Sequence, residues 1–234
     1  MTEPLWCVVP AAGRGRRFGS VRPKQYVELG GKPLLRWTLE RLAAHPRIAG
    51  LVVVLAADDL YWSGLDKIVA KPLLVAVGGK ARADSVLAGL DALASTVDAD
   101  QFVLVHDAVR PCVRAEDVDR LIELGVPAGG ALLAAPLRDT LKRADADGRA
   151  IATESREARW RALTPQMFRH GELATALRRL QVDGIDASDE AMAMEHAGHR
   201  PLLVEGSEDN IKVTTPADFA LAACLVKQRS EAGV

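Results

Sequence analysis

Apolar runs of strand length alternate with helix-period segments along the first half of this 234-residue chain. The runs expected to form buried strands are residues 5–9, 51–55, 73–77, 102–105 and 130–135. Between them, the spacing of leucine and valine predicts helices that begin near Pro33 and Ala81 and a helix over residues 117–124. Such alternation is typical of a doubly wound, mainly parallel sheet, so the sequence predicts a Rossmann-like α/β fold.

One segment, residues 137–160, interrupts this alternation. Its two halves alternate polar and apolar residues around Asp147-Gly148, a strong hairpin signal. We expect a β-hairpin arm that leaves the sheet and, because a lone hairpin is marginally stable in water, packs against a second subunit. The later sequence predicts a helix over residues 172–180, a helix with Ser188 as N-cap, a strand over 202–204, and a last helix opened by Thr215-Pro216-Ala217-Asp218.

Composition limits the class of protein. With 49% hydrophobic residues, the chain can bury a full core as a single domain over residues 1–234, with residues 137–160 as its arm. No apolar stretch reaches the ~20 residues that a membrane span needs, and no signal-peptide pattern opens the chain, so we expect a cytoplasmic protein without a membrane partner. Cys7, Cys112 and Cys224 share no metal-ligand spacing and are expected to be reduced and structural.

The loop after the first predicted strand combines glycines with basic side chains. Residues 10–26 hold Gly13, Gly15 and Gly19 and lack acidic residues. Ligands of parallel sheets bind at the carboxyl ends of the strands, where glycines let backbone N–H groups approach anionic oxygens. Because the net charge is only -1, this local basicity favours a polyphosphate ligand over a nucleic acid. The basic residues are Arg14, Arg16, Arg17, Arg22 and Lys24.

Two familiar phosphate motifs do not fit this loop. A dinucleotide fingerprint would need glycine where Phe18 stands, which disfavours a nicotinamide oxidoreductase, and the Gly-Lys-Ser/Thr of a P-loop is absent. A solvated surface loop stays open as the alternative.

Two further strand ends carry polar residues that suit a nucleotide. Asp107 follows the strand over residues 102–105 at the same sheet edge as the glycine-rich loop, where a carboxylate could hold Mg²⁺ against phosphates. A turn residue is the alternative for Asp107, and neighbouring His106 is expected to be structural. The turn at Gly78-Gly79, with the Ser85 hydroxyl one turn into the following helix, would suit contact with a base or ribose, but this motif taken alone favours a plain helix start.

Several motifs in order resemble the 2-C-methyl-D-erythritol 4-phosphate cytidylyltransferases of the non-mevalonate isoprenoid pathway. They are Pro-Ala-Ala-Gly-x-Gly-x-Arg, Pro-Lys-Gln-Tyr, Gly-Gly-x-x-Arg-x-Asp-Ser-Val, Val-His-Asp-Ala-x-Arg-Pro, Arg-Asp-Thr-Leu-Lys-Arg, Leu-Thr-Pro-Gln, Ser-Asp-Glu-Ala and Asp-Asn-Ile-Lys-Val-Thr. The match runs from about residue 8 to residue 218. It implies a nucleotidyltransferase that uses CTP, a polyol phosphate and Mg²⁺, and a homodimer with crossing arms.

The resemblance also implies a role for individual residues. It assigns nucleotide binding to Pro10, Ala11, Ala12, Gly13, Gly15, Gly79, Ser85, Asp107, Ala108 and Arg110, with Asp107 at the metal. It assigns acceptor binding to Asp107, Thr140, Arg156, Thr164, Ser188 and Lys212, and catalysis to Arg17, Lys24, Arg156 and Lys212. Thr140 and Arg156 would serve the partner's site. Ser188 stands where a threonine is expected and keeps the hydroxyl.

The chemistry of the reactants agrees with this assignment. A phosphomonoester acceptor is already anionic at neutral pH, so its attack on the α-phosphorus of CTP needs no general base, and positioning and electrostatics should supply the catalysis. Ribitol 5-phosphate or a sugar phosphate as acceptor, and a non-catalytic nucleotide-binding subunit, are the alternatives. Without the resemblance, Arg156 could lie on a solvated face and Lys212 on the outward side of a strand.

Overall fold

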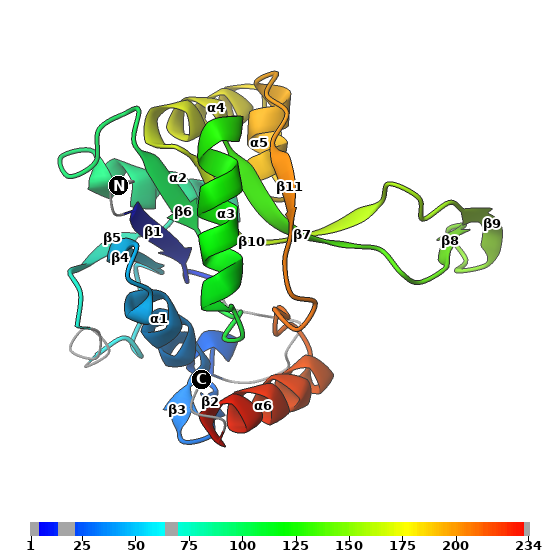
Figure 1. The fold of residues 1–234 in the computed structure, drawn as a ribbon, viewed down its shortest axis with the longest axis horizontal. Helices are drawn as coiled ribbons and strands as arrows, with labels where there is room; N and C mark the ends of the chain where they lie inside the picture. Colours follow the sequence, from blue (N-terminus) through cyan, green and yellow to red (C-terminus); the bar gives the residue numbers. More distant parts are fainter. Residues whose placement is uncertain (1–4, 14–21, 64–69, 232–234) are drawn as a thin grey trace.

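The computed structural model describes residues 5–13, 22–63 and 70–231, and its centre is a seven-stranded sheet with the order β11-β7-β10-β6-β1-β4-β5 (Figure 1). Strand β10 pairs antiparallel with β6 and β7, whereas the other neighbouring strands pair in parallel. The predicted mainly parallel α/β fold is confirmed. The strands are β1 (Leu5–Pro10), β4 (Ile48–Leu55), β5 (Leu73–Val77), β6 (Phe102–Val105), β7 (Ala131–Pro136), β10 (Trp160–Arg169) and β11 (Leu202–Glu205).

Helices cover both faces of the sheet and build a separate core on each. Side chains alternate along β1, so Cys7 and Val9 face the core under α1 and α3, while Val8 faces the core under α2, α4 and α5. A third cluster packs α6 against the loop that follows β6. The helices are α1 (Leu34–Ala44), α2 (Arg82–Leu93), α3 (Ala115–Ala128), α4 (His170–Val182), α5 (Glu190–His196) and α6 (Pro216–Glu231).

The start of α5 differs from its prediction. Asp189, and not Ser188, is the N-cap, because the Asp189 Oδ1 accepts a hydrogen bond from the Met192 N–H at 3.0 Å. Ser188 lies one residue too early to reach that amide, and its hydroxyl lies 3.6 Å from the Met192 sulfur. The expected cap of α6 is confirmed, since the Thr215 N–H donates to Asp218 at 2.8 Å.

Strand β10 has no counterpart among the predicted elements. It contains Pro165, which cannot donate to a strand ladder, and its register shifts between Ala162 and Gln166. This irregular strand lies between β6 and β7 and carries Thr164 and Gln166 into the middle of the molecule.

The predicted hairpin is present and protrudes from the body of the molecule (Figure 1). Its strands, β8 (Leu141–Ala144) and β9 (Ala150–Glu154), pair antiparallel. The Asp145 carboxylate closes the turn by accepting from the Asp147 and Arg149 N–H groups at 3.0 and 2.8 Å, and Gly148 supplies a positive φ of 78°. Within the described ranges, no helix combines the length and apolar character needed to cross a membrane.

Candidate active site

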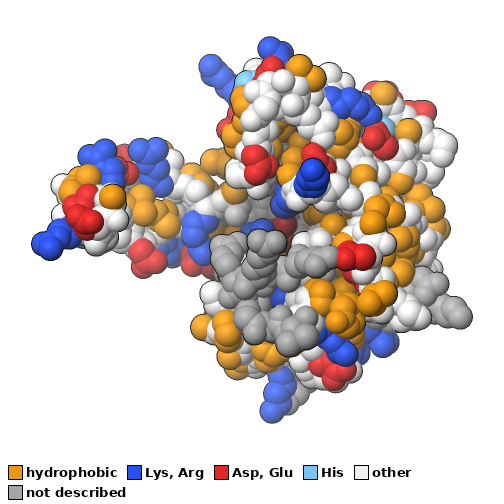
Figure 2. Space-filling model, turned by 180° about the vertical axis from the view of Figure 1, so that it is seen from behind, with side chains coloured by type: hydrophobic (Ala, Val, Ile, Leu, Met, Phe, Trp, Pro, Cys, Tyr) orange, Lys and Arg blue, Asp and Glu red, His pale blue; other side chains and the backbone are white. Residues whose placement is uncertain are grey.

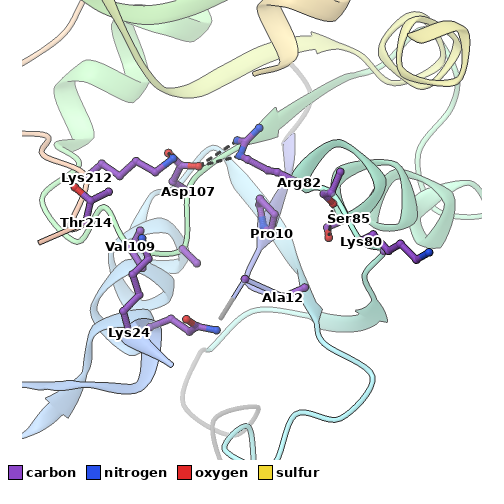
Figure 3. Close-up of a pocket in the computed structure, with 15 residues that line it drawn as sticks. Pro10, Ala12, Lys24, Lys80, Arg82, Ser85, Asp107, Val109, Lys212 and Thr214 are labelled. Carbon is purple, nitrogen blue, oxygen red and sulfur yellow. Dashed lines mark hydrogen bonds and ion pairs between the residues drawn. The ribbon is translucent and has the colours of Figure 1, made fainter. Parts of the chain in front are cut away.

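A pocket of about 360 Å³ opens at the carboxyl ends of β1 and β6 (Figure 3). Parallel strands bring these ends to one edge of the sheet, the start of α2 forms one wall, and the segment before α6 forms another. The lining residues are Pro10, Ala12, Gly13, Lys24, Gln25, Gly79, Lys80, Ala81, Arg82, Ser85, Asp107, Ala108, Val109, Lys212 and Thr214.

Asp107 is the centre of a charged cluster in this pocket. Its Oδ1 accepts from Arg82 Nε at 3.2 Å and lies 3.1 Å from Arg82 Nη2. Its Oδ2 lies 3.1 Å from Arg110 Nε and 3.0 Å from Lys212 Nζ. Burial alone would raise the pKa of this carboxyl, but the charges of Arg82, Lys212 and Arg110 outweigh burial and hold the pKa well below its usual range. Asp107 is therefore ionised whenever the protein is folded at neutral pH.

A buried hydrogen-bond network fixes the backbone of Asp107 from behind. The Asp107 N–H donates to the Thr164 hydroxyl at 3.1 Å, and that hydroxyl lies 3.0 Å from His106 Nδ1. The His106 Nε2 lies 3.1 Å from the Arg110 carbonyl oxygen. Because burial lowers the pKa of His106 to about 4, the imidazole is neutral at neutral pH, and the expected structural histidine is confirmed. Thr164 thus acts behind the pocket wall, as a support of Asp107.

Lys212 reaches Asp107 from a segment without regular structure. Residues 211–214 form no strand, so the alternative of an outward-facing strand lysine is wrong. The Arg110 guanidinium donates to the Asn210 carbonyl at 2.7 Å, and the Asn210 side-chain amide donates to the Thr164 carbonyl at 2.7 Å. The Val213 N–H donates to the Val109 carbonyl at 2.9 Å. These bonds hold the Lys212 backbone against the strand end that carries Asp107.

Lys24 comes to the same pocket from the other end of the chain. It begins a short 3-10 helix, Lys24–Tyr26, and its Nζ donates to the Val213 carbonyl at 3.1 Å. The next residue, Gln25, donates to the Ala11 carbonyl at 2.7 Å, which ties this helix to the end of β1. Lys24 and Lys212 therefore lie on one side of the pocket, as Figure 3 shows.

Two glycines allow the first strand end and α2 to approach each other. A Cβ on Gly78 would lie 2.6 Å from the Ser85 hydroxyl oxygen and 2.8 Å from the Ala12 Cβ. A Cβ on Gly79 would lie 2.4 Å from the Asp84 Cβ. Both positions thus exclude a side chain for lack of space, and the pocket wall between Ala12 and Ser85 depends on this close contact.

The residues predicted for the site fall into four groups. Pro10, Ala12, Gly13, Lys24, Gly79, Ser85, Asp107, Ala108 and Lys212 line the pocket, whereas Ala11, Arg110 and Thr164 are buried directly behind it. Gly15 and Arg17, like Arg14, Arg16 and Gly19, lie outside the described residues. Thr140, Arg156 and Ser188 are exposed and do not line the pocket of their own chain.

The two arm residues, Thr140 and Arg156, do not contact the pocket of their own chain. The Arg156 guanidinium donates to the Arg138 carbonyl, within the base of the arm. Their assignment to an acceptor site therefore depends on an arm from a second copy of the chain.

The residue that the sequence analysis missed is Arg82. It lines the pocket and bonds both to Asp107 and to the buried Glu190 at the start of α5. The sequence does contain its signal, because Arg82 is the arginine of the Gly-Gly-x-x-Arg motif and Glu190 belongs to Ser-Asp-Glu-Ala. What the spacing does not show is that these two motifs meet in space.

The donor set bears on the expected metal. Among the described residues, no group of three or more His, Cys, Asp or Glu side chains is arranged to hold a metal ion. Asp107 is a single ionised carboxylate, and Mg²⁺ commonly takes one or two carboxylates together with phosphate oxygens and water. The residues therefore fit Mg²⁺ only if a bound phosphate substrate supplies most of the ligands.

Comparisons with known proteins converge on one family. The family model for 2-C-methyl-D-erythritol 4-phosphate cytidylyltransferase matches residues 5–228. Proteins of that name from Stenotrophomonas maltophilia (strain R551-3) and Xanthomonas campestris pv. campestris (strain B100) are each 58% identical to this chain. Both alignments cover 94% of this chain, with 95% of the Stenotrophomonas protein and 83% of the Xanthomonas protein. A crystal structure of a 4-diphosphocytidyl-2C-methyl-D-erythritol synthase superimposes with a TM-score of 0.84 at 35% identity, covering 96% of this chain and 100% of that one.

Proposed function

This chain belongs to the 2-C-methyl-D-erythritol 4-phosphate cytidylyltransferase family, and we propose that the pocket around Asp107 is its active site. The enzyme transfers the cytidylyl group of CTP to 2-C-methyl-D-erythritol 4-phosphate in the non-mevalonate isoprenoid pathway. The products are 4-diphosphocytidyl-2-C-methyl-D-erythritol and pyrophosphate. The family assignment favours this acceptor over ribitol 5-phosphate or another sugar phosphate.

The chemistry needs a site that brings two anions together. An acceptor phosphate oxygen forms a bond to the α-phosphorus of CTP, and the bond from that phosphorus to the bridging oxygen of pyrophosphate breaks. Both reactants carry phosphate charge, so the barrier includes their mutual repulsion. Preorganised cations that face the developing charge lower such a barrier without a proton transfer.

One observation carries the assignment of this pocket: two lysines converge on it from opposite ends of the chain. Lys24 and Lys212 both line the pocket, and the Lys24 Nζ bonds to the carbonyl next to Lys212. We assign Lys24 to the α-phosphate and Lys212 to the acceptor phosphate. The family resemblance assigns Arg17 to the α-phosphate as well. The turn at Gly79, the Ser85 hydroxyl and the loop at Gly13 would hold the nucleotide.

Mg²⁺ is part of this proposal. Asp107 would supply a carboxylate oxygen and the triphosphate the remaining anionic ligands, since the donor set near Asp107 does not suffice alone. When bound, the ion would neutralise phosphate charge on the α-phosphoryl group and on the departing pyrophosphate.

We further propose that the arm makes the enzyme a homodimer and brings Thr140 and Arg156 to the partner's acceptor site. Figure 2 shows the arm clear of the body, with hydrophobic, basic and acidic side chains on its surface. Ile151 on β9 is 58% exposed, an unusual position for a large apolar side chain on a thin hairpin. Replacing it by aspartate should shift the sedimentation coefficient from that of a dimer toward that of a monomer.

A cytoplasmic location is the last part of the proposal. Its support is cysteine usage: Cys7, Cys112 and Cys224 are free thiols, and the first two are buried.

Pyrophosphate release tests the proposed function. The purified protein, CTP and Mg²⁺ would be combined with 2-C-methyl-D-erythritol 4-phosphate, ribitol 5-phosphate or a sugar 1-phosphate in parallel. Release with the first acceptor alone is the expected result. Release with a different acceptor would contradict the proposed substrate, and CTP binding without release would favour a nucleotide-binding subunit.

A further inference from the structure

Glu190 is a buried carboxylate that does not line the pocket but is connected to it. It is the first residue of α5 and is 1% exposed. Its Oε1 accepts from Arg82 Nη1 at 2.5 Å, and its Oε2 accepts from Arg82 Nη2 at 3.2 Å. Burial raises the pKa of Glu190, and the Arg82 charge opposes that rise. A buried carboxylate destabilises the fold unless a cation is paired with it, so the ionised form of Glu190 depends on Arg82.

Arg82 uses its other edge to hold the Asp107 carboxylate in the pocket. Its Nε and Nη2 lie 3.2 and 3.1 Å from the Asp107 Oδ1, as the dashed lines in Figure 3 mark. A guanidinium is planar, so an arginine that is fixed at one edge by Glu190 presents its other edge to Asp107 in one orientation. The direction of the Asp107 Oδ1 therefore depends on Glu190, through Arg82.

The charges in the cluster support the same conclusion. Asp107 lies within ion-pair distance of Arg82, Arg110 and Lys212. By taking both Nη groups of Arg82, Glu190 offsets part of this positive charge. Without that second carboxylate, the guanidinium would be free to turn its fork fully onto Asp107 and compete with Lys212 for it.

Glu190 also connects the two halves of the site. It lies two residues after Ser188, the hydroxyl assigned to the acceptor side, while Arg82 opens the helix that carries Ser85 on the nucleotide side. Residues next to Glu190 are held independently, because Gln166 on β10 bonds to the Asp189 carboxylate at 3.0 Å and to the Ala191 N–H at 2.7 Å. The start of α5 is thus fixed to β10 by Gln166 and to α2 by Arg82.

We propose that Glu190 is a positioning residue that sets the orientation of Asp107 through Arg82 and couples the acceptor side of the site to the nucleotide side. This inference rests on the proposed function of the pocket. According to this proposal, the ion pair between Glu190 and Arg82 contributes to turnover as well as to folding.

A double-mutant cycle tests this role. The variants are Glu190→Gln, which keeps the shape and removes the charge, Arg82→Gln, and the two combined. Asp91→Asn is the matched control, because Asp91 lies on the same helix, α2, as Arg82 and forms an exposed ion pair with Arg178 on α4. Pyrophosphate release gives kcat and the KM of each substrate, and thermal melting reports folding.

We expect Glu190→Gln to lower kcat/KM for the acceptor roughly 10- to 100-fold, the scale for losing the orienting partner of a catalytic group. The loss should be no greater when Arg82→Gln is already present, and Asp91→Asn should match the wild type. A purely structural ion pair would lower the melting temperature and leave kcat and both KM values of the folded enzyme unchanged, which would overturn the inference.

Two further outcomes distinguish a failure of the inference about Glu190 from a failure of the proposed function. If Arg82→Gln does not fold because it leaves Glu190 unpaired, Glu190→Gln decides alone: unchanged kcat and KM overturn the inference, and the predicted loss supports it. A wild-type enzyme that releases no pyrophosphate would contradict the proposed function, and the inference would fall with it; an active wild type with unaffected variants contradicts the inference only.

Discussion

His106 should make the stability of the protein depend on pH between its ordinary pKa of 6.5 and its folded pKa of about 4. The imidazole is fully buried between the Thr164 hydroxyl and the Arg110 carbonyl. Because the Thr164 hydroxyl accepts from the Asp107 N–H, its own proton is available to His106 Nδ1, and the imidazole donates from Nε2 to the Arg110 carbonyl. The site thus holds a neutral imidazole.

The magnitude follows from the pKa of His106 in the two states. Its ordinary value is 6.5, and burial lowers the pKa to about 4 in the folded protein. Between these values the unfolded chain binds a proton that the folded protein does not, so stability falls as pH falls from 6.5 toward 4. The full difference corresponds to about 3 kcal/mol, of which about 2 kcal/mol is lost between about pH 7 and about pH 4.5.

Urea unfolding of the wild type and of His106→Gln at these two pH values measures this contribution. The variant should be less stable at neutral pH by about 1–3 kcal/mol, because it leaves buried groups imperfectly paired. The gap between the two proteins should shrink by about 2 kcal/mol at the lower pH, since contributions from other groups cancel. The same substitution at exposed His199 is the control. A gap that stays constant, or one that widens toward acid pH, would refute the argument.

Three other predictions concern the site and the core. Lys24→Ala should lower kcat roughly 10²–10³-fold in the pyrophosphate assay, because it removes one preorganised cation; a loss under about fivefold would mean that Lys24 is misassigned. Gly89→Ala should lower the free energy of unfolding by about 1–3 kcal/mol in urea, because a Cβ there would lie 2.4 Å from a Val8 methyl, and an unchanged midpoint would contradict the packing. Removing Mg²⁺ with EDTA should abolish pyrophosphate release, which added Mg²⁺ restores; release that persists in EDTA would contradict the proposed metal.

The central strands that the sequence predicted, β1, β4, β6 and β7, are mostly buried on both faces, whereas the predicted edge strands β5 and β11 are partly exposed. Val8 and Val53 face opposite sides of the sheet, and both sides are covered by a hydrophobic core. Successive residues of such strands are therefore all apolar, and the resulting continuous runs are easy to recognise in the sequence. Strand β10 lacks such a run because Arg161 and Pro165 interrupt it, and its place depends on pairing with β6 and β7, which no local pattern encodes.

The site shows the same division between local and distant information. Asp107 and Gly79 could be identified because each follows its own strand directly. The bond from Arg82 to Glu190 joins residues 108 positions apart, so neither motif alone predicts it. Similarly, the alternation around Lys212 suggested a strand, whereas tertiary bonds to Asn210 and Val213 determine where that lysine lies.

The contacts that complete the pocket are among the most distant along the chain. Lys24 bonds to a carbonyl 189 residues away, and Arg110 bonds to one 100 residues away. Loop-closure entropy must be overcome before such contacts contribute, so they form after the local helices and neighbouring strands. During refolding, the sheet and its spectroscopic signature should therefore appear first, and catalytic competence should return only when the segment before α6 docks.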